Sequence, residues 1–300
     1  GHVFKSQTDT EVLPHLIAEI LKGGNKGHAE AVREALRSAK GAYALGIVFR
    51  DEPDVLYAAR CGSPLIIGVG QGEQFIASDV PAILNRVQQV IYLNDGEVAE
   101  LRRSGVALTR LDGTPVPAEI KSVTLKAEAA ERAGFETFML KEIHEQPRVL
   151  RALLEAHVDR RGAVDLGPAA APVDALARDI RRVLILSCGT AYYAGMYGRL
   201  LIERWTGIPC ETDLGSEFRY RGPRLPEQTL VVAVSQSGET ADTLASVRLA
   251  RELGCRVFSI CNVAGSSLLR ESDAALLTQA GPEIGVASTK AFTCQLAALF

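Results

Sequence analysis

Two short segments rich in hydroxyl groups and glycine contain the residues best suited to binding an anion. Cys188-Gly189-Thr190 and Ser235–Thr240 each follow an apolar run typical of a buried strand, and each leads into a helical pattern. Free N–H groups at a helix N-terminus attract anions, hydroxyl groups donate hydrogen bonds to them, and glycine allows close backbone approach. Neither segment contains Lys or Arg, so oriented dipoles and hydroxyl groups would hold a phosphate monoester there.

The two segments differ from the common nucleotide-binding motifs, because neither G-x-x-x-x-G-K-S/T nor G-x-G-x-x-G is present after these strands. A simpler interpretation is that their Ser and Thr residues only cap the helices that follow. Two such segments at successive strand ends favour an anion site, since ligands of open α/β sheets bind at the carboxyl ends of strands. A third segment, Glu283–Thr293, opens the last helix, and its Ser288 and Thr289 could cap that helix or reach a ligand.

The elements that must position these segments form a repeating strand–loop–helix pattern. This pattern predicts a parallel sheet with helices on both faces. The predicted strands are Val183–Ser187, Leu230–Val234, Arg256–Cys261 and Ala274–Leu277, and the predicted helices run from about Tyr192 to Trp205 and from Thr240 to about Leu253.

The first third of the chain has a different pattern. Thr8 and Glu11 predict a capping box for a helix over Val12–Leu21, and a second short helix is expected over Ala29–Ser38. Short β-type runs separated by Gly, Pro and Asp then predict a mostly antiparallel sheet. These runs are Tyr43–Phe49, Val55–Ala58, Leu65–Val69, Phe75–Ala77, Val90–Leu93, Val98–Leu101 and Val106–Leu111. A further helix is expected from Phe135 to near Pro147, where the proline would end it.

Composition narrows the class of protein. The chain has 300 residues, of which 47% are hydrophobic and 23% charged, and a net charge of −3, which predicts two soluble globular domains. No basic cluster indicates a nucleic-acid partner, and no apolar run reaches the ~18 residues of a membrane-spanning helix. The six cysteines lack C-x-x-C spacing and the five histidines are dispersed. We therefore expect a cytosolic protein with reduced, mostly buried cysteines and no metal site.

Several longer motifs together carry a family resemblance that runs along nearly the whole chain. The motifs are Ser6–Val12, Cys61–Leu65, Lys141–Ile143 with Glu145–Pro147, Ser216–Arg221, Ser235–Thr240 and Glu283–Thr293. With them the chain resembles the glutamine–fructose-6-phosphate aminotransferases (isomerising), also called glucosamine-6-phosphate synthases.

The resemblance implies an α/β chain in three parts. Residues 1–114 would be the C-terminal part of an N-terminal-nucleophile glutaminase (glutamine amidotransferase type 2) domain with an α+β layer, and residues 115–134 a linker. Residues 135–300 would be the first sugar isomerase (SIS) domain, a doubly wound parallel sheet truncated at its C-terminus. The family moves the amide nitrogen of glutamine onto fructose 6-phosphate and isomerises the product to glucosamine 6-phosphate, the first step of UDP-N-acetylglucosamine synthesis. It implies no metal or organic cofactor, and a homodimer of the full-length protein.

The resemblance also implies which residues bind ligands. Sugar-phosphate contacts fall on Cys188, Gly189, Thr190, Ser235, Gln236, Ser237, Thr240, Val286, Ala287 and Ser288. Of these, Cys188, Thr190 and Ser288 would line the sugar. The hydroxyl and amide groups of four others would hold the phosphate: Ser235, Gln236, Ser237 and Thr240. Ala191 stands where other members have a serine. Asp9 matches the carboxylate that binds the α-ammonium group of glutamine, a task suited to a charge-assisted hydrogen bond.

No catalytic residue is expected in this stretch. The family's nucleophilic cysteine is N-terminal, whereas this chain begins with Gly1, and the isomerase glutamate, histidine and Schiff-base lysine would lie beyond Phe300. Both ends therefore resemble truncations, and Phe300 ends the chain inside a helical pattern that has no stop signal.

Two other classes of protein use the same SIS fold. One is a non-catalytic SIS-type sugar-phosphate-binding regulator, which would carry a helix-turn-helix domain. The other is a plain sugar-phosphate isomerase, which needs no glutaminase segment. The β-rich N-terminal region, with Asp9 in a glutaminase-like motif, favours the aminotransferase over both.

Overall fold

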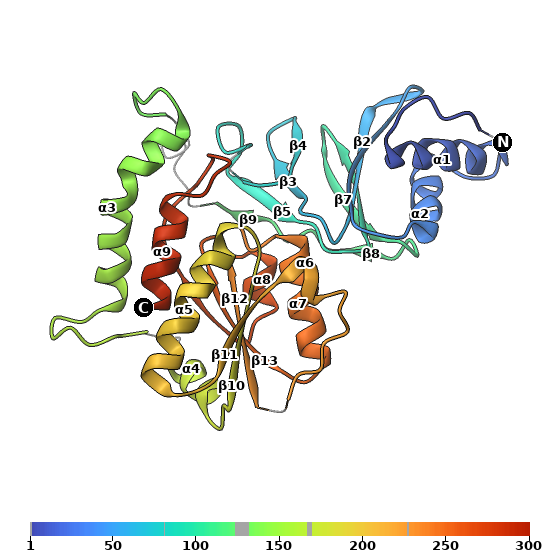
Figure 1. Ribbon diagram of the computed structural model, residues 1–300. Coiled ribbons are helices and arrows are strands. Elements are labelled where there is room, and N and C mark those ends of the chain that lie inside the picture. Colours follow the sequence, from blue (N-terminus) through green and yellow to red (C-terminus); the bar gives the residue numbers. More distant parts are fainter. Residues whose placement is uncertain (1, 81, 124–131, 167–169, 227) are drawn as a thin grey trace. The chain divides into compact units, whose positions relative to one another are not determined.

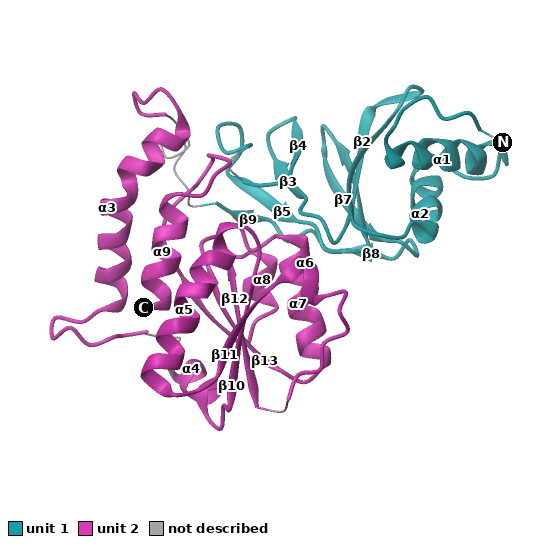
Figure 2. Cartoon of the chain, viewed as in Figure 1, with its two compact units in different colours: residues 1–126 teal, residues 127–300 magenta. Residues whose placement is uncertain are grey.

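The chain folds into two compact units, residues 1–126 and 127–300 (Figure 2). The computed structural model describes residues 2–80, 82–123, 132–166, 170–226 and 228–300. Within these ranges, no helix combines the length and the apolar composition needed to cross a membrane.

The first unit begins with helices that pack on a sheet. The short helix η1 (Asp9–Glu11) leads into α1 (Val12–Lys22), and α2 (His28–Ser38) follows, which confirms both predicted helices. Apolar side chains of α1 and α2 form one core with residues of the sheet, among them Tyr57 and Val98. This burial stabilises short helices that would be marginal alone.

The predicted capping box is wrong in its pairing. The Thr8 side chain accepts a hydrogen bond from the Thr10 N–H and so caps η1, the extra turn that precedes α1. The Glu11 carboxylate reaches further back, to the Ser6 hydroxyl and to the backbone N–H groups of Lys5 at 2.7 Å and Ser6 at 2.6 Å. These hydrogen bonds, led by that of the Ser6 hydroxyl, lower the pKa of Glu11 to about 2.

The strands of the first unit are antiparallel, as predicted, but they form two sheets where the sequence predicted one. One sheet has the order β1 (Tyr43–Phe49), β2 (Glu52–Cys61), β6 (Glu97–Arg102), β7 (Gly105–Arg110) and β8 (Pro115–Val116). The other has the order β4 (Gln74–Ala77), β3 (Ile66–Val69), β5 (Gln89–Tyr92) and β9 (Lys121–Ser122). The strands β8 and β9 lie within the segment 115–134, and residues 124–131 of that segment lie outside the described residues.

The second unit contains a five-stranded sheet in which all neighbours are parallel. Its order is β11 (Cys210–Leu214), β10 (Arg182–Ser187), β12 (Thr229–Ser235), β13 (Arg256–Cys261) and β14 (Ala274–Leu277). The four predicted strands are confirmed. The edge strand β11 was not predicted, because its sequence Cys-Glu-Thr-Asp-Leu lacks the apolar run of a central strand.

Helices cover both faces of this sheet (Figure 1), which confirms the predicted doubly wound arrangement. One core layer joins the sheet to α3 (Phe138–His157), α5 (Thr190–Thr206) and α9 (Lys290–Leu299). The opposite layer joins it to α6 (Gly215–Phe218), α7 (Ala241–Glu252) and α8 (Ser267–Arg270). Another helix, α4 (Ala170–Ala177), contacts β13 and β14. Successive residues of β10 alternate between the two layers, as a strand buried on both faces requires.

The sequence predicts that α3 ends near Pro147. This prediction is wrong, because the helix continues to His157. Pro147 has no N–H group to donate to the carbonyl of Ile143, and the Gln146 side-chain amide donates to that oxygen instead, at 3.0 Å. Beyond the proline, α3 buries Val149 and Leu153 in the core. This replacement hydrogen bond and this burial offset the cost of an internal proline, about 3 kcal/mol.

Candidate functional site

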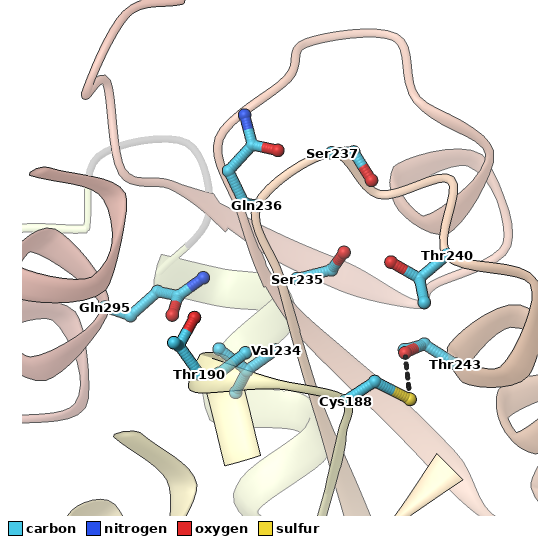
Figure 3. Close-up of a pocket in the computed structure, with 10 residues that line it drawn as sticks. Cys188, Thr190, Val234, Ser235, Gln236, Ser237, Thr240, Thr243 and Gln295 are labelled. Carbon is cyan, nitrogen blue, oxygen red and sulfur yellow. Dashed lines mark hydrogen bonds between the residues drawn. The ribbon is translucent and has the colours of Figure 1, made fainter. Parts of the chain in front are cut away.

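A polar cavity of about 110 Å³ lies at the carboxyl ends of β10 and β12 (Figure 3). The chain leaves β10 toward β11 on one side and later returns to form β12 on the other side, so these two strands mark the point where the strand order reverses. Ligands of open α/β sheets bind at this switch point. The cavity is lined by Cys188, Thr190, Ala191, Val234, Ser235, Gln236, Ser237, Thr240, Thr243 and Gln295, none of which is charged.

The segment from Ser235 to Thr240 forms one wall of the cavity between β12 and α7. The Ser235 hydroxyl oxygen accepts a hydrogen bond from the Gly238 N–H at 3.0 Å, and that of Ser237 accepts from the Glu239 N–H at 3.1 Å. Thr240 is the N-cap residue of α7, but its side chain makes no capping hydrogen bond. The capping interpretation therefore does not account for the Thr240 hydroxyl.

The region around α8 holds this segment in place. Leu268 donates its N–H to the Gly238 carbonyl at 3.0 Å, and Ser267 donates its N–H to the Glu239 carboxylate at 2.7 Å. Gly238 has a φ of +66°, and a Cβ added there would lie 2.6 Å from Ser266 Cβ and 2.7 Å from Cys261 Sγ. Both neighbours are fully buried, so only glycine fits at this position.

The segment Cys188-Gly189-Thr190 forms the second wall. Gly189, with a φ of 61°, is the N-cap residue of α5, and again no side chain caps that helix. The Thr243 hydroxyl donates to Cys188 Sγ at 3.5 Å, which links α7 to the end of β10. Of the predicted site residues, the structure thus brings together Cys188, Gly189 and Thr190 with Ser235, Gln236, Ser237 and Thr240.

The third predicted segment does not line the cavity. Val286 and Ala287 are exposed, and the Ser288 hydroxyl donates to the Glu283 carboxylate at 2.8 Å. The same carboxylate accepts the N–H groups of Thr289 at 2.9 Å and Ala291 at 3.1 Å. Glu283 therefore caps the start of α9, and Ser288 is part of that arrangement.

Helix α3 fixes this third segment through buried charges. Glu142 is only 2% exposed. Its carboxylate accepts hydrogen bonds from the N–H groups of Ile284 at 2.6 Å and Gly285 at 3.1 Å. Lys290, also 2% exposed, donates to Glu145 at 2.5 Å. Burial alone would raise the pKa of Glu145, but the pairing with Lys290 outweighs it and lowers that pKa. Two residues of the Lys141–Pro147 motif thus have a positional role that the sequence alone did not reveal.

Asp9 belongs to the first unit. It is exposed at the start of η1, and its carboxylate accepts a hydrogen bond from the Thr10 hydroxyl at 3.4 Å. The first unit also has a broader hollow of about 600 Å³, lined by residues 94–97 and 110–112. The carboxylates of Asp95, Glu97 and Asp112 outnumber Arg110, the one cation among the described residues that line it, so the hollow is poorly suited to an anion. In the described part of the chain, His, Cys, Asp and Glu side chains form no group of three that could hold a metal ion.

Sequence reasoning missed two polar residues of the cavity, Thr243 and Gln295. Thr243 lies three residues after Thr240, so the helical period of α7 could have identified it. Gln295 is a buried polar residue within the apolar helix α9, and only the packed structure shows that it faces the cavity.

Comparison with known proteins identifies the family of this chain. The SIS domain model matches residues 177–299. A glutamine–fructose-6-phosphate aminotransferase (isomerizing) from Symbiobacterium thermophilum is 51% identical over 303 residues, covering 100% of this chain and 49% of that protein. The protein of the same name from Streptomyces coelicolor is 49% identical over 300 residues, covering 100% of this chain and 48% of that protein. The chain belongs to the glutamine–fructose-6-phosphate aminotransferase family.

The chain spans about half the length of these curated relatives. A solved structure, the C-terminal domain of glucosamine-fructose-6-phosphate aminotransferase from Francisella tularensis, is similar with a TM-score of 0.53 and 43% identity. It covers 56% of this chain and 47% of that one. The match to the family extends through the antiparallel first unit, which favours the aminotransferase over the SIS-type regulator and the plain isomerase.

Replacing Gly238 by Ala should destabilise the protein through a steric clash as well as through backbone strain. Gly254→Ala is the matched control, because Gly254 has a φ of +84° but open space around its Cβ position. Both variants carry the cost of a left-handed alanine, about 1–2 kcal/mol. The clash with Ser266 and Cys261 should cost Gly238→Ala a further ~1–3 kcal/mol in the free energy of unfolding, measured in urea. Equal destabilisation of the two variants would contradict the tight packing described here.

Replacing Glu145 by Gln should lower the free energy of unfolding by about 3 kcal/mol at pH 7, because it leaves the buried Lys290 ammonium without a charged partner. The folded-state pKa of Glu145 lies below its ordinary value of 4.5. The contribution of the carboxylate is therefore present above that value and is lost as pH falls through the folded-state pKa. The difference in the free energy of unfolding between wild type and Glu145→Gln, measured in urea, should therefore shrink as the pH is lowered. Glu155→Gln, which removes an exposed carboxylate from the same helix, should show no such difference.

Proposed function

We propose that this chain binds the sugar phosphate for a glutamine–fructose-6-phosphate aminotransferase. The protein to which it belongs would transfer the amide nitrogen of glutamine to fructose 6-phosphate and isomerise the product to glucosamine 6-phosphate. Family membership over the whole chain supports the activity. The observation that carries the binding role is the cavity at the switch point, with hydroxyl groups from two strand ends.

The hydroxyl groups of the cavity are available as donors. Those of Ser235 and Ser237 accept hydrogen bonds from backbone N–H groups, which leaves their own hydrogens for a ligand. Among the described residues, neither the Thr240 nor the Thr190 hydroxyl donates a hydrogen bond to another protein group. A phosphate accepts but does not need to donate, so it matches this set of donors.

The N-terminus of α7 adds to the attraction. Its first N–H groups point toward the cavity end of the helix, and the dipole of a helix favours an anion there. Hydrogen bonds to a charged group contribute about 1.5–3 kcal/mol each, so a few hydroxyl groups can bind a phosphate without Lys or Arg. The rest of the sugar would then extend toward Cys188 and Thr190, on the second wall.

We assign the parts of the chain by the same family membership. Residues 1–114 would belong to the glutaminase domain, 115–134 to a linker and 135–300 to the first SIS domain. The two compact units and the SIS match support this division. Asp9 would bind the ammonium group of glutamine. Val286, Ala287 and Ser288 would contact the sugar only after the third segment moves toward the cavity. The residues of this chain have binding and no catalytic roles, and the full-length enzyme acts as a cytoplasmic homodimer that also binds glucosamine 6-phosphate.

The double variant Ser237→Ala/Thr240→Ala tests the binding role by calorimetric titration with fructose 6-phosphate. Removing two donors to a charged phosphate should weaken binding at least ~tenfold, since each tenfold corresponds to about 1.4 kcal/mol. The control Thr206→Ala/Ser272→Ala removes two hydroxyl groups that donate to helix carbonyls outside the cavity, both at 2.7 Å, and should bind as wild type does. Equal affinity of both double variants, or equal binding of unphosphorylated fructose, would contradict the assignment. The activity itself requires that the full-length protein form glucosamine 6-phosphate from glutamine and fructose 6-phosphate.

A further inference from the structure

We propose that Gln295 determines the specificity of this cavity by hydrogen-bonding the hydroxyl groups of a phosphorylated polyol. The inference rests on the proposed function, since it concerns the same ligand site. Gln295 would discriminate a sugar phosphate from other phosphate monoesters. The segment from Ser235 to Thr240 would bind the phosphate group, which all of these ligands have.

The first observation is an unpartnered polar atom deep in the protein. Gln295 is 2% exposed, on a helix whose neighbouring residues Ala291 and Cys294 belong to the apolar core. Its Oε1 is buried and has no hydrogen-bond partner among the described residues. Burying an amide without a partner is unfavourable, so an apolar residue would be more stable here unless a ligand completes the hydrogen bond.

The second observation is where this amide lies. Gln295 lines the cavity together with the predicted phosphate-binding residues. In Figure 3 its amide and the Thr190 side chain lie to one side of Ser235, whereas Ser237 and Thr240 lie to the other. A ligand whose phosphate binds at Ser237 and Thr240 would therefore direct its carbon chain toward Gln295.

The chemistry of the amide matches hydroxyl groups rather than phosphate. A side-chain amide offers one acceptor oxygen and two N–H donors, and a sugar hydroxyl both donates and accepts. A phosphate oxygen has no hydrogen to donate to Gln295 Oε1. Sites that hydrogen-bond a substrate hydroxyl discriminate strongly against analogues that lack it, because the polar group is then left unpaired.

Two other buried hydroxyl groups provide a comparison for Gln295. Ser187 Oγ and Ser259 Oγ also lack partners among the described residues, but neither residue lines the cavity. Ser259→Ala is thus a suitable control, since it removes a buried unpartnered polar atom of the same sheet without changing the ligand site.

The test compares three ligands by calorimetric titration: fructose 6-phosphate, n-hexyl phosphate, which lacks hydroxyl groups, and inorganic phosphate. Gln295→Met keeps the length of the side chain and removes the amide, so it should fold with unchanged or higher stability in urea. We expect it to bind fructose 6-phosphate about tenfold more weakly than wild type does, with unchanged affinity for inorganic phosphate and unchanged or tighter binding of n-hexyl phosphate, because no amide is then left unpaired by the hexyl chain. Ser259→Ala should retain the wild-type preference.

Each other outcome has a distinct meaning. Wild-type affinity of Gln295→Met for fructose 6-phosphate, or an equal loss for all three ligands, would overturn the role of Gln295 and leave the proposed function standing. Failure of the wild-type chain to bind fructose 6-phosphate at all would overturn the proposed function, and the role of Gln295 with it.

Discussion

The candidate site depends on the reversal of strand order at β10 and β12, where the chain adds β11 on one side of β10 and β12 on the other. The strands β10 and β12 are parallel neighbours, so their carboxyl ends lie at the same edge of the sheet. The helix after β10 packs on one face and the helix after β12 on the other. The two loops diverge at this point, and the space between them is the cavity.

A site without Lys or Arg places strict demands on its backbone. Dipoles and hydroxyl groups attract an anion only when they are already oriented, because reorienting them would consume the interaction energy. The hydrogen bonds from Leu268 and Ser267, and the close packing around Gly238, supply this orientation. On the other side, the buried carboxylate of Glu142 on α3 holds the segment before α9, and the partly buried carboxylate of Glu145 pairs with Lys290 at the start of α9. These hydrogen bonds and this ion pair therefore hold loops in place and do not themselves line the cavity.

Four of the five strands of the parallel sheet, and both cavity walls, could be predicted from the sequence because buried parallel strands form unbroken apolar runs that end in small polar residues. Features set by tertiary contacts could not. The continuation of α3 past Pro147 depends on a side-chain amide that replaces a backbone donor. The engagement of Ser288 with Glu283 depends on the path of the loop before α9. The proposed role of Gln295 depends on which face of the mostly apolar helix α9 lies next to the cavity.

The most direct test of the central claim is an amide chemical-shift titration of the isotopically labelled chain with fructose 6-phosphate. If the switch-point cavity holds the ligand, the largest shifts will fall on the backbone amides of residues 188–190 and 235–243, at the two strand ends and the start of α7. Residues 94–97 and 110–112, which line the hollow of the first unit, will change little. The largest shifts at that hollow, or no shifts at either place, would contradict the account.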